Sequence, residues 1–322
     1  MAISVASFAT TGAQLERLLF TLSTGAIVAA VWKVPFAMLY FDLSFSTVRY
    51  QIISGALPLL FAFGLTAAFM TPKRLWHLAL VISLGAVAVS VTRSYLVIYT
   101  VIGVVVFAVT LRVNTHRKMI ILLGLSCVLA AVVVVSLNTE TMLVGRWLDR
   151  LATPHGLADI TTLTRLAEIE FQWNALKEDI TAILFGHGMA AETRFGGSLL
   201  PILEQRLGAE GVQYTSIGYG HNQYLGFAYV GGLPAALMVT FALILPPILA
   251  LLSARKYQGI RAFILVWGAS ASIGYAVAGL LSGTFGDRST AFFYGAAMGL
   301  TWAAQSGRSV ARTPYPTDGG AT

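Results

Sequence analysis

Residues 262–281 read AFILVWGASASIGYAVAGLL, a stretch without a charged side chain. A helix that crosses the hydrocarbon core of a bilayer needs about 20 mainly apolar residues, so this stretch predicts a transmembrane helix. The composition of the full chain also indicates a lipid environment, because 57% of its 322 residues are hydrophobic and only 11% are charged. Roughly a quarter of the residues in a soluble domain are charged, and so few charges could not cover a water-facing surface of this size.

Further apolar stretches give the same prediction. The clear ones are residues 50–70, 75–91, 95–111, 119–137 and 288–305. Residues 223–252 are also apolar, and we expect Pro234, Pro246 and Pro247 to bend or break that helix. Residues 18–32 are a weaker candidate because Lys33 follows early. We therefore predict an all-α polytopic integral membrane protein with about 7–8 transmembrane helices.

The short loops alternate in charge. One set holds ten basic residues, namely Lys73, Arg74, Arg112, Arg117, Lys118, Arg255, Lys256, Arg261, Arg308 and Arg312. The alternate set holds only Arg49, Arg93 and Arg288. The positive-inside rule then places the first set in the cytoplasm and the long segment 138–222 outside. The predicted order is N-terminal transmembrane helices over 1–137, an outer loop over 138–222, C-terminal helices over 223–306 and a polar cytoplasmic tail over 307–322.

Several classes of function are disfavoured by what the chain lacks. The net charge of +7 is read as a topology signal, because no basic run is interleaved with aromatic residues as in single-strand binders, so no nucleic-acid partner is expected. A Gly-x-x-x-x-Gly-Lys loop is missing, which argues against ATP-driven chemistry. His155, His187 and His221 lack metal-ligand spacing, so neither a metal nor another cofactor is expected. The lone Cys127 cannot form an intrachain disulfide. The N-terminus lacks the basic region of a cleaved signal peptide.

A helix is predicted over 160–180, inside the outer loop, with Asp159 or Thr161 as its cap. Its apolar side chains recur at helical spacing: Leu166, Ile169, Trp173, Leu176 and Ile180. We expect this stripe to be a packing face. Polar residues occupy another face: Arg165, Glu168 and Gln172.

Three residues are candidates for chemistry at the outer face. Arg93 ends one apolar stretch, Arg165 lies early on the loop helix, and His221 lies where the loop re-enters the membrane. Arginine presents a planar charged fork that matches phosphate oxygens, and histidine can accept a proton near neutral pH. Two arginines and a histidine at one membrane surface would suit a lipid-linked phosphate.

Each candidate also has a purely structural interpretation. Arg93 could be an interfacial arginine that extends to the headgroups, and His221 could belong to an aromatic belt with neighbouring tyrosines. Arg165 could be a solvated residue or a partner of Glu168. His187, between two glycines, could be a turn residue.

An ordered set of short motifs resembles the O-antigen ligase and polymerase superfamily. The motifs are Thr92-Arg93-Ser94-Tyr95 between two spans, Leu163-Thr164-Arg165, Trp173, Leu184-Phe185-Gly186-His187-Gly188, His221-Asn222-Gln223-Tyr224-Leu225 and Gly231-Gly232-Leu233. The match covers roughly residues 50–300. Family members usually carry more spans before the arginine hairpin, so the chain looks short at its N-terminus.

The resemblance implies a GT-C-like helical membrane fold in the bacterial inner membrane, with its active face in the periplasm. It implies a metal-independent glycosyltransferase that moves a glycan from undecaprenyl diphosphate onto a glycan or a lipid A core acceptor. His221 would correspond to the family's essential loop histidine, and Arg93 and Arg165 to its diphosphate-binding arginines. His187, Asn222 and Arg288 are further supporting candidates.

Two other functions remain open at this point. One is a transporter or flippase of the same lipid-linked glycan, although transporters commonly place ionisable residues inside their spans. The other is a non-catalytic membrane scaffold.

Overall fold

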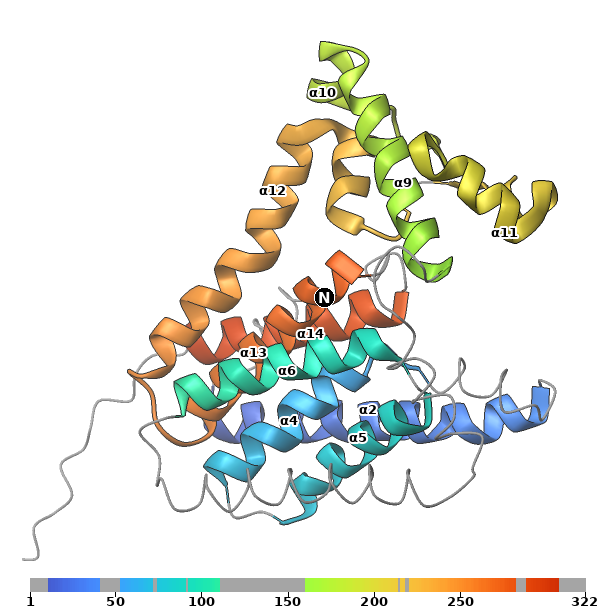
Figure 1. Ribbon diagram of the computed structural model, residues 1–322. Helices are drawn as coiled ribbons and strands as arrows, with labels where there is room; N and C mark the ends of the chain where they lie inside the picture. The colour runs from blue at the N-terminus through green and yellow to red at the C-terminus, as the bar shows by residue number, and fades with distance from the viewer. Residues whose placement is uncertain are drawn as a thin grey trace, which may run out of the picture.

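The computed structural model describes residues 11–40, 53–71, 74–90, 92–110, 160–213, 215–217, 220–281 and 288–306. The expected span over 119–137 and the expected tail over 307–322 lie outside these residues. Where described, the chain is mostly helical, with a helical bundle, a long helix α12 (Gln223–Ala254) that packs on it, and a smaller outer unit that lies against α12 (Figure 1).

Within the described residues, six apolar helices make up the bundle. They are α2 (Gly12–Tyr40), α4 (Leu57–Met70), α5 (Leu78–Ser90), α6 (Arg93–Val109), α13 (Gly259–Leu281) and α14 (Arg288–Ser306), with a short 3-10 helix η1 (Arg74–His77) before α5. The expected hairpin of two apolar stretches around Arg93 is formed by α5 and α6. Helix α13 packs against α4, α6 and α14, as well as α12.

Small residues let the bundle helices approach α13 closely. A side chain at Gly268 would overlap Thr301 of α14, and one at Gly274 would lie 2.5 Å from Ile102 of α6. Two buried aromatic residues of α13 also reach α4 and its N-terminal approach: Trp267 Nε1 donates to Leu59 O at 3.2 Å, and the Tyr275 hydroxyl donates to Gly55 O at 2.5 Å. These bonds satisfy the polar atoms of large aromatic side chains inside an apolar core.

Helix α12 (Gln223–Ala254) is long and kinked. The prolines predict a bend or a break in this helix, but the non-helical residue is Gly232, with φ 80° and ψ 167°. A positive φ is readily adopted only by glycine, so the chain turns there, directly before the helix that contains all three prolines. Pro234 falls in the first turn after the break, where a missing N–H costs least.

The outer unit consists of short elements between residues 160 and 217. They are α9 (Ile160–Lys177), α10 (Ile180–Phe185), β1 (Glu192–Arg194), the 3-10 helix η2 (Gly197–Leu199), α11 (Leu200–Val212) and β2 (Thr215–Ile217). Strands β1 and β2 pair antiparallel, with Thr193 opposite Ser216. Helices α9 and α10 together cover the range 160–180 in which one helix was expected, with the break at Glu178 and Asp179.

Three helices in the described part of the chain are long and apolar enough to cross a membrane: α2 over Gly12–Phe36, α12 and α13. The weak candidate at 18–32 thus becomes a long helix. By contrast, α4, α5 and α6 have 14, 13 and 17 residues, fewer than the about 20 that a transmembrane helix needs. These apolar helices belong to a membrane-embedded, all-α protein, and the expected count of 7–8 spans is not confirmed.

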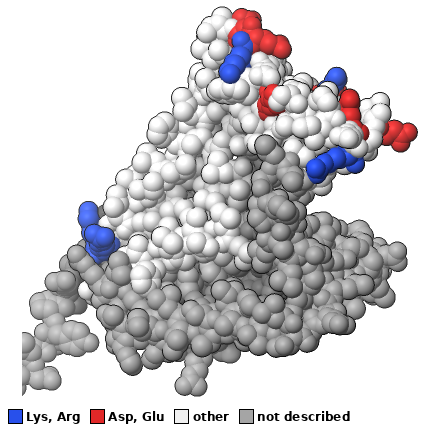
Figure 2. Space-filling model, in the orientation of Figure 1, with Lys and Arg blue, Asp and Glu red and all other residues white. Residues whose placement is uncertain are grey.

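The charged side chains are unevenly distributed. On the face seen in Figure 2, acidic and basic groups gather over the outer unit, and a basic group lies at the far end of α12. Between them, the described surface of α12 carries no charged side chain. Arg255 and Lys256 are the exposed basic residues that follow α12.

Candidate functional site

Helix α9 turns a polar face inward. Glu168 is 2% exposed and Gln172 is 1% exposed, and both lie on the side of α9 that carries the buried Ala167 and Leu176. The expectation that the apolar stripe is the packing face is wrong for Trp173 and Ile180, which are 45% and 65% exposed. The polar face can be buried because hydrogen bonds to neighbouring elements replace those to water.

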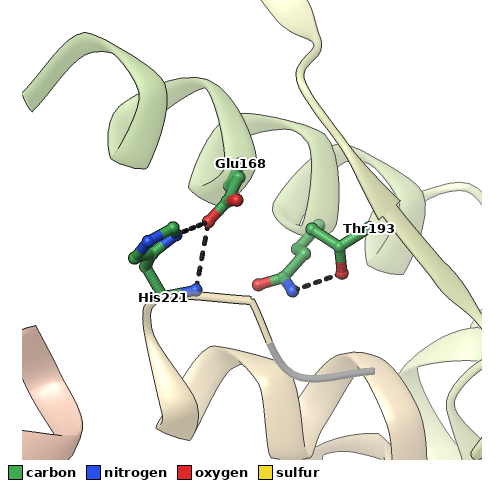
Figure 3. A network of polar contacts seen from close by, with 4 residues as sticks. Glu168, Thr193 and His221 are labelled. Atoms are coloured by element: carbon green, nitrogen blue, oxygen red, sulfur yellow. Dashed lines mark hydrogen bonds and ion pairs between the residues drawn. The ribbon is translucent and has the colours of Figure 1, made fainter. Parts of the chain in front are cut away.

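The central contact of this face joins Glu168 to His221. Glu168 Oε2 accepts a hydrogen bond from the backbone N–H of His221 at 3.0 Å and lies 2.6 Å from its Nδ1 (Figure 3). The His221 side chain is 42% exposed, so its ring has one side against a buried carboxylate and the other open. Glu168 Oε1 is buried and accepts no hydrogen bond from any residue that the structure describes.

The chemistry open to this pair depends on where the proton lies. An ionised carboxylate only accepts hydrogen bonds, so with Glu168 ionised Nδ1 is the donor. In the neutral ring Nε2 then carries a lone pair and can accept a proton from a bound hydroxyl. The buried carboxylate would stabilise the imidazolium that forms, which is the arrangement a general base requires.

Gly220 permits the close approach of this loop to α9. Its φ is 62°, and a side chain there would lie 3.0 Å from Gln172 Nε2 and 3.4 Å from Glu168 Oε2. Next to it, Gln172 Nε2 donates to the hydroxyl of Thr193 on β1 at 2.9 Å (Figure 3). The two hydrogen-bonded pairs therefore attach α9 to β1 and to the start of α12.

The residues after His221 hold it in place. Asn222 caps α12, its side-chain oxygen accepting from the Leu225 N–H at 3.1 Å. The Tyr224 hydroxyl donates to Ala276 O of α13 at 2.8 Å, which ties the start of α12 to the bundle. Asn222 thus has a structural role that accounts for its position, and Tyr224 joins the site to the C-terminal half of α13.

Arg93 and Arg288 begin helices at this same end of the bundle. Arg93 is the first residue of α6, and two residues later the Tyr95 hydroxyl donates to Ser54 O at 3.3 Å.

Arg288 is the exposed first residue of α14, whose Ser289 and Thr290 lie against Gly55. The Tyr275 hydroxyl, on α13, also bonds Gly55 O. Both arginine positions therefore flank the segment around Gly55, at the end of α13 to which Tyr224 connects His221. The side chain of Arg93 lies outside the described atoms.

The opposite end of the bundle carries other basic residues. The Tyr257 hydroxyl, beside Arg255 and Lys256, donates to Gln305 O near the end of α14 at 3.0 Å. The length of α13 separates these residues from Arg288.

Arg165 and His187 differ in their relation to the site. Arg165 lies one helical turn before Glu168 on α9, partly exposed, with its Nε buried. His187 is an exposed turn residue between Gly186 and Gly188, both at positive φ, as one of its two interpretations predicts. Its N–H donates to Tyr229 O at 2.8 Å, roughly two helical turns along α12 from His221. The structure does not bring His187 to the His221–Glu168 pair.

A separate apolar cavity lies between α2 and α14. It has a volume of about 350 Å³ and is lined by Leu18, Leu22 and Gly25 of α2 and by Phe292 and Phe293 of α14, among others. It begins one helical turn after Arg288. An extended hydrocarbon chain is the kind of molecule that such a lining accepts.

Sequence reasoning missed the role of Glu168. Glu170, two residues along α9, faces Ser198 instead, accepting from its N–H at 2.9 Å and from its hydroxyl at 3.1 Å. The signal that could have been used is an acid at the centre of a polar helix face in a loop that ends in a histidine. Among the residues described, no group of three His, Cys, Asp or Glu side chains is placed to hold a metal ion.

Comparison with known proteins adds no relative. No family model matches the chain, and neither a curated protein nor a solved structure resembles it significantly.

Proposed function

We propose that this protein is a membrane glycosyltransferase that moves a glycan from undecaprenyl diphosphate onto an acceptor hydroxyl without a metal ion. The observation that carries the proposal is the pairing of His221 with the buried Glu168, which leaves Nε2 of a half-exposed imidazole available as a base. The ordered motifs around Arg93, Arg165 and His221, which resemble the O-antigen ligase and polymerase superfamily, supply the substrate class.

The transfer needs few groups. The acceptor hydroxyl gives its proton to His221 Nε2 while its oxygen attacks the anomeric carbon of the donor sugar. The bond from that carbon to the diphosphate oxygen breaks, and the diphosphate leaves with the electron pair. Glu168 stabilises the imidazolium formed in this step. A positioned base of this kind typically contributes about 10²–10⁴-fold to the rate.

The leaving diphosphate requires positive charge. Arg93 and Arg165 are proposed to bind it, and Arg288 to assist, because arginine forms paired hydrogen bonds to phosphate oxygens. Supporting this, Arg93 and Arg288 start helices at the end of the bundle to which Tyr224 ties His221. Arg165 lies one turn from Glu168. The cavity between α2 and α14 begins one helical turn after Arg288 and is proposed to take part of the polyprenyl chain.

Reconstitution with an undecaprenyl-diphosphate-linked glycan tests the proposal. The expected result is transfer that His221→Ala and Arg93→Ala abolish while both variants still insert in the membrane. Product analysis separates the two subclasses, because a polymerase yields long chains still on lipid and a ligase moves the glycan onto lipid A core. Normal transfer by both variants would refute the assigned roles.

One observation favours a second candidate, a transporter of the same lipid-linked glycan. Helix α12 is discontinuous at Gly232, and broken helices are common at transporter binding sites. Vesicles that move labelled lipid-linked glycan across the bilayer, with no transfer to any acceptor, would support this candidate and exclude the first.

A further inference from the structure

Helix α10 exposes apolar side chains. Ile180 is 65% exposed, Leu184 45% and Phe185 71%, and Met189 in the turn that follows is 72% exposed. On the inner side of α10, Ala182 is buried. Large apolar side chains gathered on one surface mark a site of interaction with a protein or a membrane.

The backbone fixes α10 to one point on α12. The N–H groups of His187 and Gly188 donate to Tyr229 O and Val230 O at 2.8 and 2.9 Å. A side chain at Gly186 would lie 2.5 Å from the Val230 backbone, and one at Gly232 would overlap the backbone of Leu184. The end of α10 is therefore packed directly on the kink of α12 (Figure 1).

That kink is where the apolar surface of α12 begins. Beyond Gly232 the helix exposes Leu237 at 57%, Met238 at 73% and Phe241 at 64%. Residues 233–254 extend about 33 Å as a helix, close to the thickness of a bilayer's hydrocarbon core of about 30 Å. If this part of α12 spans the core, the kink and α10 lie at the membrane surface, and the exposed side chains of α10 continue the lipid-facing surface of α12.

The residues next to α10 have the composition of a membrane interface. Trp173 is 45% exposed, and Lys177 Nζ lies 4.8 Å from the centre of its ring. Exposed Glu178 and Asp179 follow, and Figure 2 shows such charged groups at this corner of the molecule. Tryptophan and lysine are favoured at the level of the headgroups, where each side chain can contact the hydrocarbon with its apolar part and water with its polar group.

We propose that α10 and the Met189 turn insert into the interfacial layer of the bilayer, beside the outer end of the α12 span. The partner is a lipid surface. Because α9 leads directly into α10, this contact would hold the Glu168 side of the candidate site against the headgroups. The proposal concerns placement in the membrane and does not depend on the reaction assigned above.

Site-specific fluorescence tests it in the full-length protein. In a Cys127→Ser background, Phe185→Cys and Met189→Cys are labelled with an environment-sensitive fluorophore and reconstituted in vesicles of phosphatidylethanolamine and phosphatidylglycerol. Glu210→Cys on α11, also an exposed position, is the matched control. We expect blue-shifted emission at 185 and 189, quenched at least twofold by brominated acyl chains, and water-like, unquenched emission at 210.

Two results would overturn the proposal. Emission at both 185 and 189 that matches position 210 would place α10 in water. Blue-shifted emission that brominated lipids leave unquenched and that fades on dilution into excess lipid would assign the surface to a second copy of the chain. Ile180→Cys, labelled in the same way, gives an independent reading if one labelled variant folds poorly.

Discussion

One oxygen atom of Glu168 accepts a hydrogen bond from the backbone N–H of His221 and lies 2.6 Å from Nδ1 of the same residue, across 53 positions of sequence. The carboxylate is almost fully buried, whereas the imidazole is half exposed. The pair thus orients a histidine from its protected side and leaves the other side free for a substrate.

Glu168→Gln should separate the charge of this carboxylate from its geometry. The amide oxygen can still accept both bonds, but it cannot stabilise an imidazolium to the same extent. Hydrogen bonds to charged groups are worth about 1.5–3 kcal/mol, which corresponds to a fall in kcat of about 10- to 150-fold with little change in KM. Steady-state kinetics of glycan transfer in vesicles measure both constants.

Glu170→Gln is the control for that experiment, because its carboxylate lies two residues along α9 and bonds Ser198 instead. It should keep a kcat near that of the unmodified protein. Equal losses in the two variants would mean that the carboxylates only maintain the outer unit, and the role of Glu168 would be refuted.

Tyr224→Phe should loosen the start of α12 from the bundle. The change removes the hydroxyl that donates to Ala276 O, a bond worth about 1 kcal/mol. Hydrogen exchange over residues 220–226 is expected to become about fivefold faster, since 1.4 kcal/mol corresponds to tenfold. Tyr257→Phe, which removes the similar bond to Gln305 O at the other end of the bundle, should leave exchange in 220–226 unchanged.

Gly232→Ala should destabilise the junction of α10 and α12. The residue has φ 80°, and a methyl group there would overlap the backbone of Leu184, which cannot move aside as a flexible side chain would. Gly259→Ala carries a similar backbone penalty at φ 60° but meets no atom within 4 Å. Overpacking typically costs about 1–3 kcal/mol, so unfolding in mixed micelles should show that difference between the variants. Equal stabilities would contradict the packing of α10 on the kink.

Gly25→Leu should obstruct the cavity between α2 and α14. A side chain at Gly25 meets no atom within 4 Å and extends into space that the cavity includes. If a polyprenyl chain lies there, the loss of two buried methylene groups costs about 1.6 kcal/mol and raises the KM for the lipid donor about 15-fold. Gly85→Leu on α5, equally open but away from the cavity, should leave KM unchanged. A KM that Gly25→Leu does not alter would exclude this path for the lipid.

The helices that the sequence predicted best are those that form because of the composition of their own segment. Residues 262–281 form most of α13, and the two stretches around Arg93 form α5 and α6, because uninterrupted apolar residues satisfy their backbone groups only within a helix. The prolines of α12 predict a bend or a break, but the non-helical residue is Gly232. A contact with the backbone of Leu184 makes a glycine necessary there, and that contact is not visible in the sequence of α12.

The sequence by itself determined that this protein is embedded in a membrane and where its apolar helices lie. Both follow from the composition and spacing of residues within short segments of the chain. It also put Arg93, Arg165 and His221 forward as candidates. Only the tertiary structure decided which face of α9 is buried, because hydrogen bonds to Thr193 and His221 make burial of its polar side favourable. The pairing of Glu168 with His221 was also decided only by the tertiary structure. It depends on how Gly220 lets a distant segment approach α9, and no local pattern encodes that approach.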